Sequence, residues 1–344
     1  MTTTALALDP HCLAHNMGPH HPESPERLAA LRTLIQGEAV TPMNLLRLDA
    51  QRADAEAITR IHTSPYFERI AATDGRTVSL DPDTTTCPAS FDAALRAAGS
   101  TLAATEAVLR GDARNAFALV RPPGHHAEPF RAMGFCLFNS VAIAAAQARA
   151  VHGLERIAIV DFDVHHGNGT QRAFYEDPAV LYISTHQAPY YPGTGAGHEV
   201  GRAGAEGSTL NLPLRAGEGD ATYGTIYESV LPRVLEQFEP ELVLVSAGFD
   251  LMANDPLGGM EVSVEGVRRI AAGLVGAAER LCAGRTVFLL EGGYDLPSLT
   301  DGVRTCLEVL QKPPAGDRPL PAVDAGALGS ARNQMPILET YFQF

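Results

Sequence analysis

The chain has 344 residues, of which 45% are hydrophobic, and it carries a formal net charge of -14 at pH 7. This acidity argues against nucleic acid as a direct ligand, because phosphate backbones are bound by basic surfaces. Residues 1–10 do not resemble a signal peptide, and no run reaches the roughly 18 apolar residues of a membrane helix. The five cysteines are odd in number and scattered, which is typical of reduced thiols. We therefore expect a cytoplasmic location without a membrane partner.

The predicted elements alternate between short apolar strands and longer helices. A His- and Pro-rich segment at 11–27 leads into a helix over 28–36, whose start is marked by Ser24 and Pro25. Residues 81–88 are predicted to form a turn-rich loop, and residues 185–207 a long loop rich in Gly, Pro and Tyr. A proline-rich tail that ends regular structure, and that either wraps the body or frays, is expected from about residue 311. Further helices are expected over 53–62, 65–73, 89–109, 141–151, 223–237 and 262–282.

Four apolar runs are typical of buried parallel strands. They lie at 117–120, 157–160, 242–245 and 287–290. Their alternation with helices predicts an α/β fold in one domain, residues 1–344, with a central, mostly parallel sheet and helices on both faces. Because active sites of open α/β sheets form beyond the carboxyl ends of the strands, we expect the active site at that edge.

Each of these runs is followed by residues of the kinds that bind metals or transfer protons. Asp163, His165 and Asp250 together offer two carboxylates and one imidazole, which suit Zn²⁺ with an open position, or Fe²⁺ or Co²⁺. Taken alone, Asp161 and Asp163 could cap a loop and His165 could be an ordinary polar residue. Four such clusters at one sheet edge favour the metal site.

Acid–base and oxyanion chemistry is suggested by the other two clusters. His125 and His126 can take a proton from water at the metal and return it to a leaving amine. Asp161 and Asn168 are available to orient these rings. Tyr294 follows two glycines, Gly292 and Gly293, and its hydroxyl can donate to a carbonyl oxygen as negative charge develops there. Together these groups describe hydrolysis of an amide.

The same residues lie in a series of motifs that resembles the zinc-dependent histone deacetylase-like amidohydrolases. This superfamily also includes acetylpolyamine amidohydrolases and, more remotely, arginases. The GNGTQ, DPLGG and LEGGYD forms resemble class II members more than class I. The motifs are HPESPERL (21–28), RPPGHHA (121–127), GFCLFN (134–139), DFDVHHGNGTQ (161–171), YPGTG (191–195), SAGFD (246–250), DPLGG (255–259) and LEGGYD (290–295).

The resemblance implies an arginase/deacetylase-like fold and assigns roles within the site. Zn²⁺ would be bound by Asp163, His165 and Asp250. His126, oriented by Asn168, would be the main general base and acid. His125 would pair with Asp161 and stabilise charge in the transition state, while Tyr294 would polarise the scissile carbonyl.

The resemblance further implies a narrow channel for acyl-lysine and structural potassium. Asp83 would hold the substrate backbone and Leu257 would lie at the rim. The full channel set is Gly134, Phe135, Tyr191, Leu257, Asp83, Gly292 and Gly293. One K⁺ would be bound by oxygens of Asp161, Asp163, His165, Ser184 and Thr185, and a second near Phe174, Asp177 and Val180. Cys136 is interpreted as a small buried wall residue rather than a reactive one.

Several alternatives remain open for the function. Leu257 replaces the acidic rim residue of class II-type polyamine enzymes, which favours acetyl-lysine over acetylpolyamine, although Glu128 or Glu199 could supply a carboxylate instead. An arginase-like two-metal site is disfavoured because His166 and Gly167 follow His165. A non-catalytic acyl-lysine reader is disfavoured by the intact His125, His126 and Tyr294. The loop at 185–207 or the tail could mediate self-association.

Overall fold

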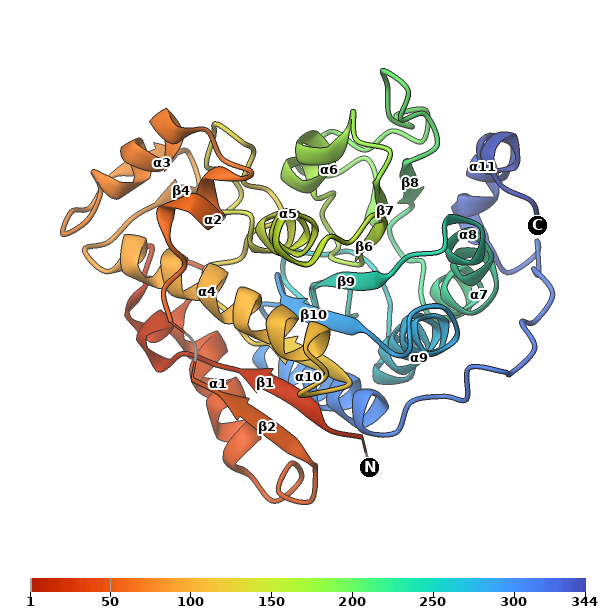
Figure 1. Cartoon of the computed structure of the whole chain (residues 1–344), viewed down its shortest axis with the longest axis horizontal. Helices are drawn as coiled ribbons and strands as arrows, with labels where there is room; N and C mark the ends of the chain where they lie inside the picture. The colour runs from red at the N-terminus through yellow and green to blue at the C-terminus, as the bar shows by residue number, and fades with distance from the viewer. Residues whose placement is uncertain (1, 50) are drawn as a thin grey trace.

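The computed structural model describes residues 2–49 and 51–344, and its centre is one eight-stranded sheet (Figure 1). All neighbouring strands of this sheet run parallel. The order across the sheet is β2 (Leu45–Leu48), β1 (Thr4–Ala7), β5 (Asn115–Ala118), β10 (Thr286–Leu290), β9 (Leu242–Ala247), β6 (Ile157–Asp161), β7 (Val180–Gln187) and β8 (Thr209–Leu214). The predicted α/β fold with a central parallel sheet is confirmed.

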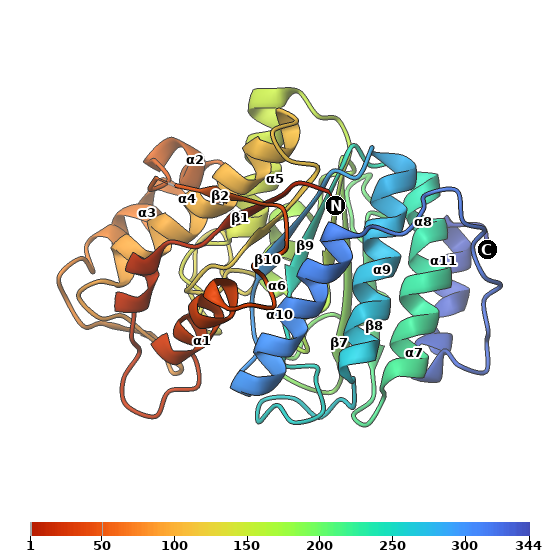
Figure 2. The ribbon, with the colours of Figure 1, turned by 90° about the horizontal axis from the view of Figure 1, so that it is seen from below.

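Helices cover both faces of this sheet (Figure 1 and Figure 2). One face is covered by α1 (Pro25–Gln36), α7 (Asp220–Thr225), the π-helical turn η2 (Ile226–Val230), α8 (Leu231–Phe238), α9 (Val264–Leu281) and α10 (Leu296–Gln311). The other face is covered by α4 (Ser90–Leu109), α5 (Ser140–His152) and α6 (Asn168–Phe174). A peripheral lobe contains α2 (Ala55–Thr59), α3 (Ser64–Ala71) and the hairpin β3 (Ser79–Asp81) and β4 (Thr84–Thr85), and η1 (Pro10–Ala14) packs on α4.

Burial on both faces explains why the central strands are continuous apolar runs. In β6, Ala158 and Val160 pack into the cluster on one face, whereas Ile157 and Ile159 pack into the cluster on the other. Successive side chains of a strand alternate between faces, so every position of a doubly covered strand must be apolar. This arrangement brings the carboxyl ends of β5, β10, β9 and β6 side by side at the centre of the sheet.

The predicted helices agree closely with the structure, whereas the predicted loops at 81–88 and 185–207 overlap β4 and the end of β7, and one strand is displaced. The runs at 157–160, 242–245 and 287–290 match β6, β9 and β10, but β5 begins two residues before the predicted 117–120 and ends at Ala118. The start of β5 was not predicted because Asn115 is polar, although it is buried in the structure. Its side-chain amide donates to the Leu310 carbonyl, and its Oδ1 accepts from the Thr4 hydroxyl. The segments of β1, β2, β7 and β8, and of α6 and α10, were not identified from the sequence.

The C-terminal tail departs from its prediction. After a proline-rich stretch the chain forms a 3-10 helix, η3 (Gly329–Gln334), and a short helix, α11 (Met335–Tyr341). Leu328, Ala331 and Leu338 are buried, and η3 packs on β8. The expectation that regular structure ends near residue 311 is therefore wrong, whereas the alternative of a tail that wraps the body agrees with these buried side chains (Figure 1). Among the described residues, the helices are all too short or too polar to cross a membrane.

A buried ion cluster ties the segment at 11–27 to the loop after β5. Arg121 Nη2 donates to Glu23 Oε2 at 2.7 Å, and Arg27 Nη1 donates to Glu23 Oε1 at 3.2 Å. Both guanidinium groups and the carboxylate are fully buried. Burial would raise the pKa of Glu23, but the charge of Arg121 and the contact with His15 hold it far below its usual range. The carboxylate is thus the counter-charge for two buried cations.

Replacing Glu23 by Gln is expected to destabilise the protein by about 3–5 kcal/mol, since it leaves buried guanidinium charge without its partner. The free energy of unfolding, measured by urea denaturation, checks this. Glu68→Gln, at an exposed position of α3, is the control and should change stability by less than about 0.5 kcal/mol. A loss below 1 kcal/mol for Glu23→Gln would show that the carbonyls around Arg121 suffice to neutralise it.

Candidate active site

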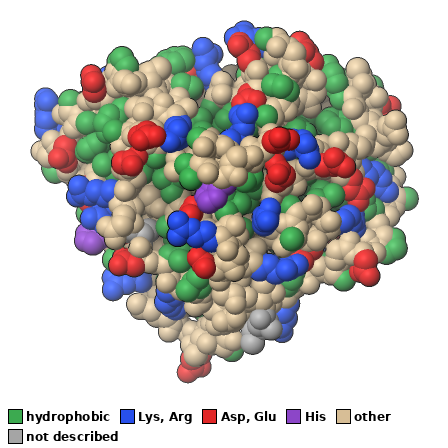
Figure 3. Space-filling view, in the orientation of Figure 1, with side chains coloured by type: hydrophobic (Ala, Val, Ile, Leu, Met, Phe, Trp, Pro, Cys, Tyr) green, Lys and Arg blue, Asp and Glu red, His purple; other side chains and the backbone are tan. Residues whose placement is uncertain are grey.

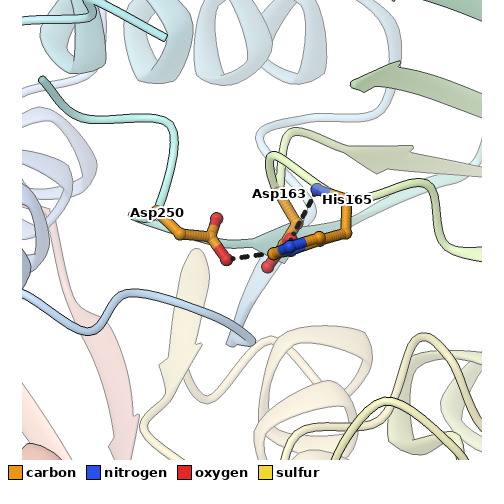
Figure 4. A group of neighbouring side chains, drawn as sticks. All are labelled: Asp163, His165 and Asp250. Carbon is orange, nitrogen blue, oxygen red and sulfur yellow. Dashed lines mark hydrogen bonds and ion pairs between the residues drawn. The ribbon is translucent and has the colours of Figure 1, made fainter. Parts of the chain in front are cut away.

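Three potential metal ligands meet beyond the carboxyl ends of β6 and β9. Asp163 and His165 follow the end of β6, and Asp250 lies three residues beyond the end of β9 (Figure 4). One ligand atom from each residue lies within 4.8 Å of the others. His165 Nδ1 is 3.1 Å from Asp163 Oδ1 and 3.3 Å from Asp250 Oδ2. The structure thus brings the predicted ligand set together.

The surroundings of the triad fit a bound cation. Asp250 Oδ2 is buried and, apart from its contact with His165 Nδ1, has no hydrogen-bond partner, whereas Asp250 Oδ1 accepts from the Val164 amide at 3.0 Å. Glycine keeps the space beside this oxygen free, because a Cβ on Gly292 would lie 2.0 Å from Asp250 Oδ2. A donor set of two carboxylates and one imidazole, with an orphaned buried oxygen, suits Zn²⁺ or a similar divalent ion.

The pKa shifts of the triad residues also favour a bound cation. Burial, reinforced by the charge of Asp163, raises the pKa of Asp250 to about 7. Burial alone would lower the pKa of His165, but Asp163 and Asp250 raise it to about 10. Two buried carboxylates at this spacing repel each other, so a cation between them would relieve both the repulsion and the cost of burial.

The histidine pair is held by a carboxylate below it. After β5 the chain turns through Gly124, whose amide donates to Glu291 Oε2 at 2.7 Å, and the His125 amide donates to the same oxygen at 3.2 Å. The other oxygen of Glu291 accepts from the Ser246 hydroxyl. Glu291 has no predicted role, although it lies in the LEGGYD motif that contains Tyr294.

The two rings are placed in opposite electrostatic settings. His125 Nδ1 donates to Asp161 Oδ2 at 3.0 Å. Burial alone would lower the pKa of His125, but the charges of Asp161 and Asp163 raise it well above the usual value. His126 Nδ1 lies 2.9 Å from Asn168 Oδ1. Burial and the positive charges of His125 and His165 hold the pKa of His126 well below its usual value. His126 is therefore the neutral ring, suited to accept a proton.

Tyr294 reaches the same cavity from the loop after β10. Burial raises the pKa of its phenol well above the usual value, so the hydroxyl remains a hydrogen-bond donor. Its backbone is fixed by buried Asp255, whose Oδ2 accepts from the amides of Tyr294 and Asp295 and whose Oδ1 accepts from Leu257. In the sequence, Asp255 is only the first residue of the DPLGG motif. Nothing in that motif predicts that its carboxylate links the backbone at Leu257 to the backbone at Tyr294 and Asp295.

One cavity is lined by most residues of the predicted channel: Asp83, Gly134, Phe135, Tyr191, Leu257 and Gly292, with His125, His126, His165 and Tyr294. Tyr190 and Pro123, which sequence analysis did not single out, also line it. Gly293 does not line this cavity, because its backbone packs against Phe249 and adopts a φ of +119°. Cys136 is buried behind the wall, where its thiol donates to the Gly134 carbonyl.

The two carboxylates considered as alternative rim acids are engaged elsewhere. Asn168 Nδ2 donates to Glu128 Oε1 at 3.0 Å. Glu199 Oε2 accepts from Gln171 Nε2 at 2.6 Å and from the Gly195 amide at 3.3 Å. Neither side chain is among the residues that line the cavity. The interpretation of Glu128 or Glu199 as a rim acid is therefore wrong, because both are bound by side chains of α6.

The residues of the predicted potassium sites lie next to the triad and in the turn after α6. Ser184 pairs in register with Asp161, and its hydroxyl contacts His186 Nδ1 at 2.9 Å, while the Thr185 hydroxyl contacts the Tyr227 hydroxyl. In the second set, Asp177 Oδ1 accepts from the Ala179 amide. These side chains already have partners, so any cation would depend largely on backbone carbonyls. Both potassium sites stay predictions.

Comparisons with known proteins agree with this geometry. Residues 21–310 match the family model described as the histone deacetylase domain. A probable deacetylase from Archaeoglobus fulgidus is 39% identical over 85% of this chain and 82% of its own length. A histone deacetylase-like amidohydrolase from Pseudomonas aeruginosa is 40% identical over 85% of this chain and 81% of its own. The crystal structure of the HDA15 HD domain superposes with a TM-score of 0.91 at 35% identity, covering 99% of this chain and 95% of that one.

Proposed function

The chain belongs to the histone deacetylase family, and on this premise we propose that it is a zinc-dependent deacetylase that hydrolyses the amide of N-acetyl-lysine to acetate and a free amine. The observation that carries the proposal is the convergence of three groups at the cavity, which the triad reaches through His165. They are the Asp163–His165–Asp250 triad, the oppositely tuned His125 and His126, and the protonated phenol of Tyr294.

Each of these side chains has a defined task in this reaction. Zn²⁺ held by the triad would supply a Lewis acid that acidifies water and polarises an acyl carbonyl. His126 takes the proton from the attacking water and later gives it to the departing amine. His125, paired with Asp161, keeps positive charge beside the reacting atoms, and Tyr294 donates its hydroxyl to the carbonyl oxygen as that oxygen becomes negative.

The rim favours an acyl-lysine in a peptide or protein. Leu257 presents no carboxylate, and Glu128 and Glu199 are engaged elsewhere, so Asp83 is the one described lining carboxylate that could attract a second ammonium group. On the face seen in Figure 3, acidic and basic side chains are interspersed. Acetylpolyamine remains the second candidate, because Asp83 is the one carboxylate among the described residues that line the cavity.

The proposal is tested by loading the protein with Zn²⁺ and measuring amine release from an acetyl-lysine peptide and an acetylpolyamine in parallel. We expect a higher kcat/KM for the peptide. Preference for the polyamine would retain the mechanism and change the substrate. No turnover of either amide, with zinc bound, would contradict the proposed activity and favour a non-catalytic acyl-lysine reader. Fe²⁺ and Co²⁺ are tested in the same assay, since O/N ligands discriminate poorly among these ions.

Leu257→Glu is expected to raise the ratio of polyamine to peptide kcat/KM by up to about fivefold, because a rim carboxylate would pair with a substrate ammonium in a solvent-exposed setting. Leu257→Gln is the matched control of similar size without charge, and it should leave the ratio near that of the unchanged protein. Equal ratios for the two variants would show that Leu257 does not face the bound substrate. The ratios should also converge at high salt if charge is the cause.

A further inference from the structure

A short chain of hydrogen bonds leads from the proposed general base away from the cavity. His126 Nδ1 lies 2.9 Å from Asn168 Oδ1, and Asn168 Nδ2 donates to Glu128 Oε1 at 3.0 Å. Asn168 is buried at the start of α6, and the Glu128 side chain is only 16% exposed. Asn168 Nδ2 also approaches Met133 Sδ at 3.3 Å, which is a weak acceptor.

The chemistry of these groups fixes the direction of every hydrogen bond in the chain. A carboxylate can only accept, so Asn168 must turn its NH₂ group toward Glu128 and its carbonyl oxygen toward His126. A carbonyl oxygen can only accept as well, so Nδ1 of His126 must carry the hydrogen. In a neutral ring, Nε2 on the opposite edge then has the free lone pair.

We propose that Glu128 is a positioning residue for catalysis, which fixes the amide orientation of Asn168 and thereby holds His126 in the tautomer that can act as a base. This inference rests on the proposed function. Without Glu128, the two ends of the Asn168 amide are nearly equal in size and nothing of comparable strength selects one. A reversed amide would present NH₂ to His126 and consume the lone pair of Nδ1, leaving hydrogen on Nε2, where the base must be free.

The backbone around Glu128 is suited to this task because it is held on both sides. The Glu128 amide donates to the Arg131 carbonyl at 2.9 Å, and the Glu128 carbonyl lies 3.1 Å from His62 Nδ1. Arg172 Nε is 4.0 Å from Glu128 Oε2 and lies on the surface side of the carboxylate. Glu128 is thus fixed between the body of the protein and an exposed cation, without itself touching the substrate cavity.

The first test compares kcat and KM for four variants on an acetyl-lysine peptide. Glu128→Ala should lower kcat by about 10- to 100-fold with little change in KM, as for residues that orient a reacting group. Asn168→Asp should also lower kcat, because a carboxylate at 168 faces Glu128 where an N–H donated before. Glu128→Gln combined with Asn168→Asp should recover about tenfold over Asn168→Asp alone, since the Gln amide then donates to Asp. Glu176→Gln, an exposed carboxylate of the same outer surface paired with Arg202, is the control and should be unaffected.

The second test observes the His126 tautomer directly and does not depend on turnover. In protein labelled with ¹⁵N-histidine and loaded with Zn²⁺, two-bond ¹⁵N–¹H correlations should show His126 with hydrogen on Nδ1. The signal is assigned by its loss in His126→Ala. Glu128→Ala should yield a mixture of tautomers at unchanged zinc content and thermal midpoint.

These tests separate failure of the inference from failure of the proposed function. An unchanged tautomer and unchanged kcat in Glu128→Ala, or no recovery in the double variant, would overturn the role of Glu128. If the unaltered protein hydrolyses no acetyl amide, yet its His126 tautomer depends on Glu128, the proposed function fails while the positioning role is supported.

Discussion

Asp250→Ala is expected to abolish Zn²⁺ binding and reduce hydrolysis of an acetyl-lysine peptide at least about a thousandfold, equivalent to about 4 kcal/mol of barrier. The reason is the number of protein ligands that remain for the metal. Removing the carboxylate with the orphaned buried oxygen leaves only Asp163 and His165, too few to hold the ion in a buried site. Metal content after dialysis, measured by elemental analysis, and kcat/KM check the two halves of the prediction.

Asp83→Asn is the matched control for this experiment. Asp83 lines the same cavity but lies outside the triad, so its variant should retain zinc while changing only substrate binding. Treating the unaltered protein with a chelator should reproduce the loss of activity, and added Zn²⁺ should restore it. Stoichiometric zinc or full activity in Asp250→Ala would contradict the ligand assignment. Added Zn²⁺ is not expected to rescue Asp250→Ala at comparable concentrations.

The central strands and the residues that follow them could be predicted because local sequence determines both. A strand buried on two faces must be an apolar run, and the polar residues that end β6 and β9 fall at one sheet edge once the strands are parallel. Strand β7 was not predicted because it ends in four polar residues, Ser184, Thr185, His186 and Gln187. Their partners include the Tyr227 hydroxyl, the Gly195 carbonyl and the Gly259 amide, which no local pattern reveals.

Contacts between distant segments account for most of what the sequence did not reveal. Arg27 Nε donates to the Gly293 carbonyl across 266 positions of the chain, and its guanidinium lies 4.8 Å from the centre of the Tyr294 ring. The partners of Glu128 and Asp255 likewise depend on loops whose paths are set by tertiary packing. Residue types alone therefore predicted most of the residues that meet at the cavity, whereas the side chains that hold them in place became visible only in three dimensions.

Tyr294→Phe is expected to lower kcat by about 10²–10³-fold, or about 2.7–4 kcal/mol, the range for loss of one donor to a developing oxyanion. KM and zinc content should stay close to those of the unaltered protein, because the phenol ring and the triad are retained and only the hydroxyl is lost. The ring contacts with Phe135 and Arg27 do not involve that hydroxyl, so the backbone held by Asp255 should not shift. Steady-state kinetics with zinc-loaded protein provide the measurement.

Tyr191→Phe tests whether any phenol in the cavity has this effect. Tyr191 also lines the cavity, with its ring edge-on to His126, but it belongs to the loop before residue 207 rather than to the strand edge that carries Tyr294. Its variant should keep kcat within about twofold, because a wall residue contributes contact rather than charge stabilisation. Equally slow turnover by Tyr294→Phe and the unaltered protein would mean that no oxyanion is stabilised in this cavity, and the acyl-lysine reader would then be the better account. A large loss confined to Tyr294→Phe instead requires an amide carbonyl to reach that hydroxyl during turnover, which only a hydrolytic site explains.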